Sequence, residues 1–130
     1  MPITDIFLEV DNRKDQLIGY HIDFDQHIDD RTGKPVGRPS LTQFSIRIRR
    51  ESEDAAPTYI DWQLEPTMQK DLDICFYDNH HLKRTIKIGQ AYLVSYNQNN
   101  HEPGAIEESL VLSPQTIELD GVSFDRRDYK

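Results

Sequence analysis

Residues 82–98, LKRTIKIGQAYLVSYNQ, form the longest uninterrupted β-type run in the chain and decide its fold class. Apolar and polar residues alternate in the first half, where Ile86 and Ile88 stand between polar neighbours, and this pattern predicts a strand with one wet face. Residues 91–94 are all apolar, which predicts cover on both faces of the strand. We therefore expect a strand that starts at a rim and ends inside the domain.

The rest of the chain is also mostly of β type. Two-residue alternation predicts further strands over 3–10, 17–28, 41–49, 72–77, 106–112, 117–119 and 122–124. In the predicted strand 17–28, Ile18, Tyr20, Ile22 and Phe24 lie on one face. In the predicted strand 41–49, Phe44, Ile46 and Ile48 point inward. The polar segments 11–15, 78–81 and 120–121 predict turns between strands, and residues 97–104 predict a longer loop.

One segment has a different period. In TYIDWQLEP, residues 58–66, Tyr59 and Trp62 are spaced as on a helix. Asp54 or Thr58 is the expected cap and Pro66 the expected end, which gives one helix of about two to three turns. Trp62 is its predicted anchor into the body of the protein.

Length and composition predict one domain, residues 1–130, with 125–130 as a loose tail. The hydrophobic fraction of 36% and the mean hydropathy of −0.72 indicate a thin core, which suits a small barrel or sandwich, or a protomer that buries more surface against neighbours. The first 15 residues resemble no signal peptide and no run reaches membrane-spanning length, so we expect a cytoplasmic protein without membrane insertion.

Charge is strongly segregated along the chain. The net charge of −8 argues against general nucleic-acid binding, which needs a basic surface. Residues 1–30 carry −6, residues 31–50 carry +6 and residues 51–81 carry −7. A basic block between acidic ones favours head-to-tail association of copies, although chance clustering of solvated charges would give the same pattern.

The segment 29–40, DDRTGKPVGRPS, holds two glycines and two prolines and predicts a loop. Its cations Arg31, Lys34 and Arg38 would project from that loop. At twelve residues it is long for a connection in a compact domain. It is therefore either an ordinary solvated connection or an extended arm that contacts a partner.

No catalytic, cofactor or metal site is predicted. His80 and His81 are adjacent, but neighbouring residues on a strand point apart and no third ligand has a suitable spacing, so a surface turn is favoured over a metal site. Ser95 and Ser113 lack the glycine-flanked turn of a nucleophile elbow. Cys75 is the only cysteine and lies between Ile74 and Phe76, which predicts a buried thiol without a disulfide. We expect a protein that is not an enzyme.

The motifs in order resemble those of the Hcp (TssD) family, the tube proteins of bacterial type VI secretion systems. The resemblance rests on GRPS at 37–40, Trp62 in a single short helix, ICFYD at 74–78, IKIGQAYLVSY at 86–96 and SLVLSPQTIEL at 109–119. It covers residues 17–119, and the order and spacing of the motifs carry it.

This resemblance implies a mainly β fold, a small antiparallel β-barrel of two packed sheets with one short flanking helix. It also implies hexameric rings that stack into a tube, with sheath, spike and effector proteins as partners and export without a signal peptide. The loop would contribute to ring and stacking contacts through Arg31, Thr32, Gly33, Lys34, Arg38 and Pro39. The alternative is a monomeric β-barrel that binds a small ligand in its interior.

Overall fold

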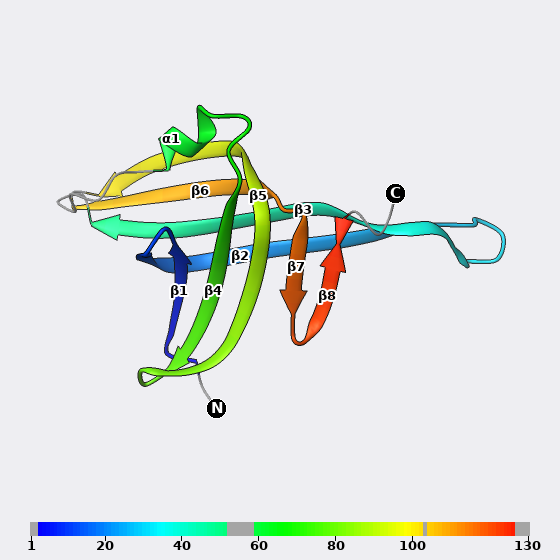
Figure 1. Cartoon of the computed structure of the whole chain (residues 1–130), viewed down its shortest axis with the longest axis horizontal. Helices are drawn as coiled ribbons and strands as arrows, with labels where there is room; N and C mark the ends of the chain where they lie inside the picture. The colour runs from blue at the N-terminus through cyan, green and yellow to red at the C-terminus, as the bar shows by residue number, and fades with distance from the viewer. Residues whose placement is uncertain (1–2, 52–58, 103, 127–130) are drawn as a thin grey trace.

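A computed structural model describes residues 3–51, 59–102 and 104–126. In this part of the chain the structure is an antiparallel sheet with one helical turn (Figure 1). The elements in chain order are β1 (Asp5–Val10), β2 (Arg13–Ile28), β3 (Pro35–Glu51), α1 (Ile60–Gln63), β4 (Lys70–Asp78), β5 (His81–Glu102), β6 (Ala105–Ser113), β7 (Thr116–Leu119) and β8 (Val122–Asp125).

The sheet closes on itself. The strand order is β4-β1-β2-β3-β6-β5-β7-β8, and an additional pairing between β4 and β5 joins the first strand to the sixth. These six strands form an uneven barrel, and the β7–β8 hairpin attaches to it at Lys87–Gly89 of β5. The long strand predicted from residues 82–98 is β5, and it pairs with β4 and β7 in its first part and with β6 in its second part.

Alternating apolar side chains fill the barrel, as the sequence predicted for several strands. Phe44, Ile46 and Ile48 of β3 are each 0% exposed. They pack with the inward residues of neighbouring strands, which include Leu8, Leu72, Ile74, Ile86, Ile88, Leu110 and Ile117. A small barrel has room for little more than these side chains, so the interior is a packed core.

The prediction that residues 91–94 are covered on both faces is wrong. Ala91 and Leu93 are buried, but Val94 is 53% exposed. Against β4, Leu72 pairs with Ile88 and Lys70 pairs with Ala91, so β5 carries one extra residue there. Gln90, at φ 51°, forms part of this bulge. The bulge shifts the phase of alternation, so that the buried positions pass from Ile86 and Ile88 to Ala91 and Leu93.

A second irregularity corrects the predicted face of β2. The register with β3 shifts between Leu17 and Gly19, so Leu17 is buried and Ile18 is 45% exposed. Tyr20 and Ile22 do lie on the barrel side, since Tyr20 contacts the Phe76 ring and Ile22 packs against the core. One extra residue again reverses the alternation that the sequence suggested.

Two predicted loops are largely strand. Residues 35–40 belong to β3, and β5 continues to Glu102 within the segment 97–104. Pro35 is the first residue of its strand, and Pro39 lies outside residues 45–51 of β3, which pair with β6, so both positions tolerate a missing N–H. The prolines are therefore compatible with an edge strand, and they were not evidence for a loop.

The helix is shorter than predicted. It contains Ile60–Gln63, a single turn, and the predicted caps Asp54 and Thr58 lie outside the described residues. Trp62 is 1% exposed within the core cluster, and its ring N–H donates to the Met68 carbonyl at 3.0 Å. One turn is enough to place this side chain over the barrel.

The chain end is more ordered than the predicted tail 125–130 suggested, as far as it is described. Asp125 pairs with Thr116 in the β7–β8 hairpin, and the Arg126 N–H donates to the Gln115 carbonyl at 2.8 Å. The hairpin turn, Asp120 and Gly121, has positive φ at both residues, as the sequence predicted for a two-residue turn. Residues 127–130 lie outside the described part.

Candidate assembly interface

Strands β2 and β3 continue together well beyond the barrel and form an arm (Figure 1). We use "arm" for residues 25–40. Its two strands pair from Asp25 with Ser40 to Ile28 with Pro35, with a register shift between Asp25 and His27. The segment that was predicted as an irregular loop is thus a β-hairpin that projects from the body.

The tip of the arm has a defined turn. Asp29 accepts hydrogen bonds on Oδ1 from the backbone N–H groups of Arg31, at 2.8 Å, and Thr32, at 3.1 Å. The Gly33 N–H donates to the Asp29 carbonyl at 2.8 Å, and Gly33 has φ 74°, a conformation that glycine adopts without strain. The Lys34 N–H donates to the Thr32 hydroxyl at 3.3 Å. Four of the predicted interface residues therefore form one ordered tip.

The remaining predicted residues lie on β3 of the same arm. Pro39 is half-buried, and Arg38 belongs to the strand, although its side chain lies outside the described part. Arg31 and Lys34 are exposed at the tip. The structure brings the six predicted residues into a single projecting element.

The arm also exposes apolar side chains. Ile28 is 57% exposed and Val36 is 46% exposed, close to the tip where the sequence highlighted cations. Exposed single apolar residues are common, but on a thin two-stranded projection they add apolar area whose burial against a partner is favourable. The arm therefore offers both charge and apolar surface to a partner.

Part of the basic block is paired with acids inside the protomer. Arg47 pairs with Glu107 at 3.3 Å, and Arg50 pairs with Glu108 at 3.1 Å. The charge segregation seen in the sequence is thus partly an internal pairing of β3 with β6, while Arg31 and Lys34 stay exposed at the tip of the arm. The charge argument for association therefore does not apply to the whole block.

Sequence reasoning missed a buried polar cluster below the helix. Glu108 is 0% exposed and accepts hydrogen bonds from Arg50 at 3.1 Å, from the Tyr96 hydroxyl at 2.7 Å and from the Tyr59 N–H at 3.4 Å. The Tyr59 hydroxyl in turn donates to Asp15, and burial, with this hydrogen bond, raises the pKa of Tyr59. The cluster fastens the start of the helical segment to β6 and β2.

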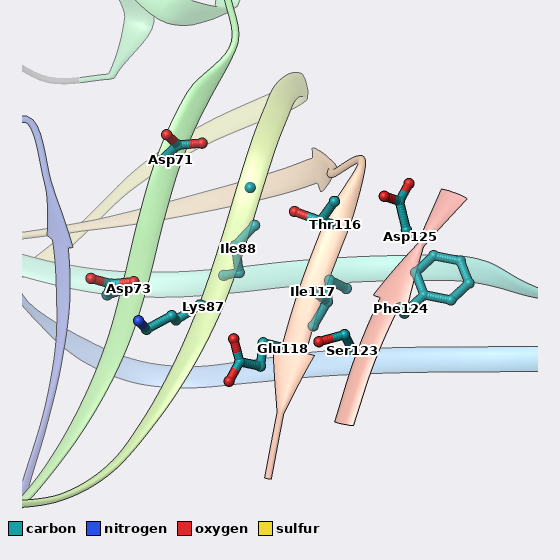
Figure 2. A pocket seen from close by; sticks show the side chains of 11 residues that line it. Asp71, Asp73, Lys87, Ile88, Thr116, Ile117, Glu118, Ser123, Phe124 and Asp125 are labelled. Carbon is teal, nitrogen blue, oxygen red and sulfur yellow. The ribbon is translucent and has the colours of Figure 1, made fainter. Parts of the chain in front are cut away.

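A surface cleft of about 460 Å³ lies over β4, β5, β7 and β8 (Figure 2). Asp71 and Asp73 approach it from β4 and Glu118 from β7 (Figure 2). Burial raises the pKa of Asp73, while the Lys87 ammonium opposes that rise. At the floor, a Cβ on Gly89 would overlap the Thr116 hydroxyl, which explains the glycine at the β5 bulge. A glycine inside a strand pattern signals such a close approach.

Other candidate chemistry remains dispersed. Cys75 is buried, and burial followed by its hydrogen bond to Glu9 raises the pKa of the thiol to about 12. His80 lies in the turn between β4 and β5, and His81 begins β5. Among the described residues, no three His, Cys, Asp or Glu side chains are grouped to hold a metal ion. No helix in that same part of the chain is long and apolar enough to cross a bilayer.

Solved structures share this fold. Hcp1 from Flavobacterium johnsoniae is 18% identical, with a TM-score of 0.79 over 94% of this chain and 99% of that chain. Hcp2 from Salmonella typhimurium is 13% identical, with a TM-score of 0.65 over 98% and 99% of the two chains. A chain of the sheath-tube complex of an extracellular contractile injection system, PVC, in its extended state is 14% identical, with a TM-score of 0.59 over 96% and 91%.

At these identities the likeness shows the fold, and that fold is the class of β-barrel found among the proteins of contractile injection systems. The family follows from the sequence as a whole. The model of "Hemolysin coregulated protein Hcp (TssD)" matches residues 4–127, so the chain belongs to the Hcp (TssD) family. A search of curated proteins finds no significant match.

Proposed function

We propose that this chain is a structural subunit of a type VI secretion inner tube. In this proposal protomers form hexameric rings, and the rings stack into a hollow tube. The observation that carries the proposal is the family match over residues 4–127, together with the shared fold of the solved Hcp structures. The arm is the feature of this chain through which copies would make contact.

The arm suits head-to-tail contacts. A ring closes through heterologous contacts, in which one surface of a protomer meets a different surface of the next. A projecting hairpin with exposed Ile28, Val36, Arg31 and Lys34 is one such surface. In the proposal, ring and stacking contacts are made by Arg31, Thr32, Gly33, Lys34, Arg38 and Pro39.

The proposed role is structural and not enzymatic. Packed apolar side chains occupy the barrel interior, including Phe44 and Ile46 at 0% exposure. This packing favours a wall-forming subunit over a monomeric barrel that encloses a small ligand. Sheath, spike and effector proteins are the proposed partners, and the tube would leave the cytoplasm through the secretion apparatus carrying effectors or tip proteins.

Light scattering coupled to size-exclusion chromatography tests the assembly directly. The expected mass is six times the 15.2 kDa of the protomer, with salt dependence where exposed charges contribute. A single monomeric peak that persists as the protein concentration is raised would contradict the proposal. A melting temperature that rises with a small apolar ligand, in a monomer, would favour the ligand-binding alternative.

A further inference from the structure

The arm receives little support from the sheet. Pairing of β2 with β1 covers residues 13–16 of β2, and pairing of β3 with β6 covers residues 45–51 of β3. Beyond these ranges the two strands pair with each other. A two-stranded ribbon is at best marginally stable in water, so the direction of the arm depends on side-chain contacts with the body.

Those contacts can be followed outward along the ribbon. Tyr20 meets the Phe76 ring edge-on at 5.9 Å, and Ile22 and Leu41 pack against the core. Phe24, two residues further along β2 than Ile22, is 38% exposed. Residues 25–28 are all exposed. Phe24 therefore lies at the point where the ribbon leaves the body.

Phe24 contacts one aromatic side chain of the C-terminal hairpin. Its ring meets the ring of Phe124 on β8, with centroids 5.1 Å apart and an interplanar angle of 69°. Figure 1 shows β8 crossing the ribbon near the base of the arm. Edge-to-face aromatic pairs are favourable beyond the apolar area that they bury. The contact joins β2 to β8 near the base of the arm.

The ribbon is irregular at the same place. Its register shifts between Asp23 and Phe24 and again between Asp25 and His27. Bulges of this kind bend a strand and increase its local twist. A bend in a two-stranded ribbon allows the arm to point in more than one direction unless a contact at the bend fixes it.

Phe124 is held firmly on its own side. It pairs in register with Ile117, which is 2% exposed in the core, and Ile117 pairs with Ile88 of the barrel. One residue beyond β8, the Arg126 guanidinium donates from Nε to the Pro114 carbonyl at 3.1 Å. The β7–β8 hairpin therefore presents the Phe124 ring from a fixed support.

We propose that Phe124 is a positioning residue for the arm, holding the bent ribbon in one direction through its contact with Phe24. The consequence for assembly rests on the proposed function, because a pre-oriented arm loses less entropy when it docks on another copy. The positioning itself concerns a single protomer and does not depend on assembly.

The test is hydrogen–deuterium exchange of the whole chain, read by mass spectrometry, in Phe124→Ala. The matched control is Val122→Ala on the same strand, where the side chain is 71% exposed. Amides of the arm should exchange about two- to tenfold faster in Phe124→Ala, and peptides from β5 and β6 should stay unchanged. Phe124→Tyr, which keeps the ring, should retain the slow exchange.

Phe24→Ala removes the same contact from the ribbon side and must give the same local effect, even if Phe124→Ala fails to fold. Equal arm exchange in the aromatic variants and in Val122→Ala would overturn the proposal, as would an increase spread over β5 and β6. In electron micrographs, the Phe124→Ala protein should form hexameric rings but shorter stacks. Absence of rings in the unmodified protein would defeat the tube function and leave the exchange test intact.

Discussion

The substitution Glu108→Gln tests the buried polar cluster that connects the helical segment to β6 and β2. Glu108 is 0% exposed and faces the Arg50 guanidinium, whose side chain is 4% exposed, at 3.1 Å. The amide that replaces the carboxylate keeps an oxygen for the Tyr96 hydroxyl but removes the negative charge. Arg50 then stays buried without this counter-charge.

The expected loss is large. Removing one partner of a buried ion pair costs about 3–5 kcal/mol, because the remaining charge stays in a medium of low polarity. A domain of this size has a total unfolding free energy of about 5–15 kcal/mol. We therefore expect Glu108→Gln to lower the free energy of unfolding by about 3–5 kcal/mol.

Urea denaturation at pH 7 and fixed protein concentration measures this loss. The matched control is Glu107→Gln, one residue earlier on β6, where the pair with Arg47 lies at the surface and the expected cost is below about 1 kcal/mol. The double variant Arg50→Met with Glu108→Gln should recover part of the loss, since no buried cation remains. Equal small losses at Glu107 and Glu108 would refute the reasoning.

Three further changes have defined outcomes. Gly89→Ala should lower the free energy of unfolding by about 1–3 kcal/mol, because the new Cβ overlaps the Thr116 hydroxyl, and Thr116→Ala in the same chain should recover it in urea melts. Burial raises the pKa of Cys75 to about 12 from an ordinary value of 9.0. The folded thiol therefore keeps a proton that the unfolded chain loses, so stability falls between about pH 9 and 12, by at most about 1.4 kcal/mol per pH unit, and Cys75→Ala removes this component. Arg31→Glu with Arg38→Glu should shorten stacks of rings in electron micrographs, with added salt acting in the same direction.

Unchanged stability in Gly89→Ala would mean that the close approach to Thr116 is not required. A pH slope that is the same with and without Cys75 would assign it to other groups. Stacks that shorten equally in Lys83→Glu, at the exposed start of β5, would show a general charge effect and remove the arm from the account.

Alternation predicted the strands well where the ladder is regular. Phe44, Ile46 and Ile48 are buried as expected because β3 pairs with β6 without a register shift there. The bulges at Leu17 and Gln90 could not be located from alternation alone, since an extra residue changes the phase without changing the composition. Glycine within the β5 run was the available signal, and it lies next to the bulge.

The segment that forms the arm was singled out from the sequence, but a loop was predicted there and not a β-hairpin. Its prolines and glycines matched a loop, yet an edge ribbon tolerates Pro35 and Pro39, and its glycines have positive φ at the tip (Gly33) and within β3 (Gly37). The contact of Phe24 with Phe124 joins residues far apart in sequence, and the pairing of Arg50 with Glu108 does the same. Such pairs depend on how the strands are arranged in space, which no local pattern encodes.

Images of the purified protein in negative stain test the central claim most directly. The account predicts six-fold rings with an open lumen in class averages, together with short stacks at high protein concentration. Featureless particles of protomer size at that same concentration would contradict the assignment of this chain as a tube subunit.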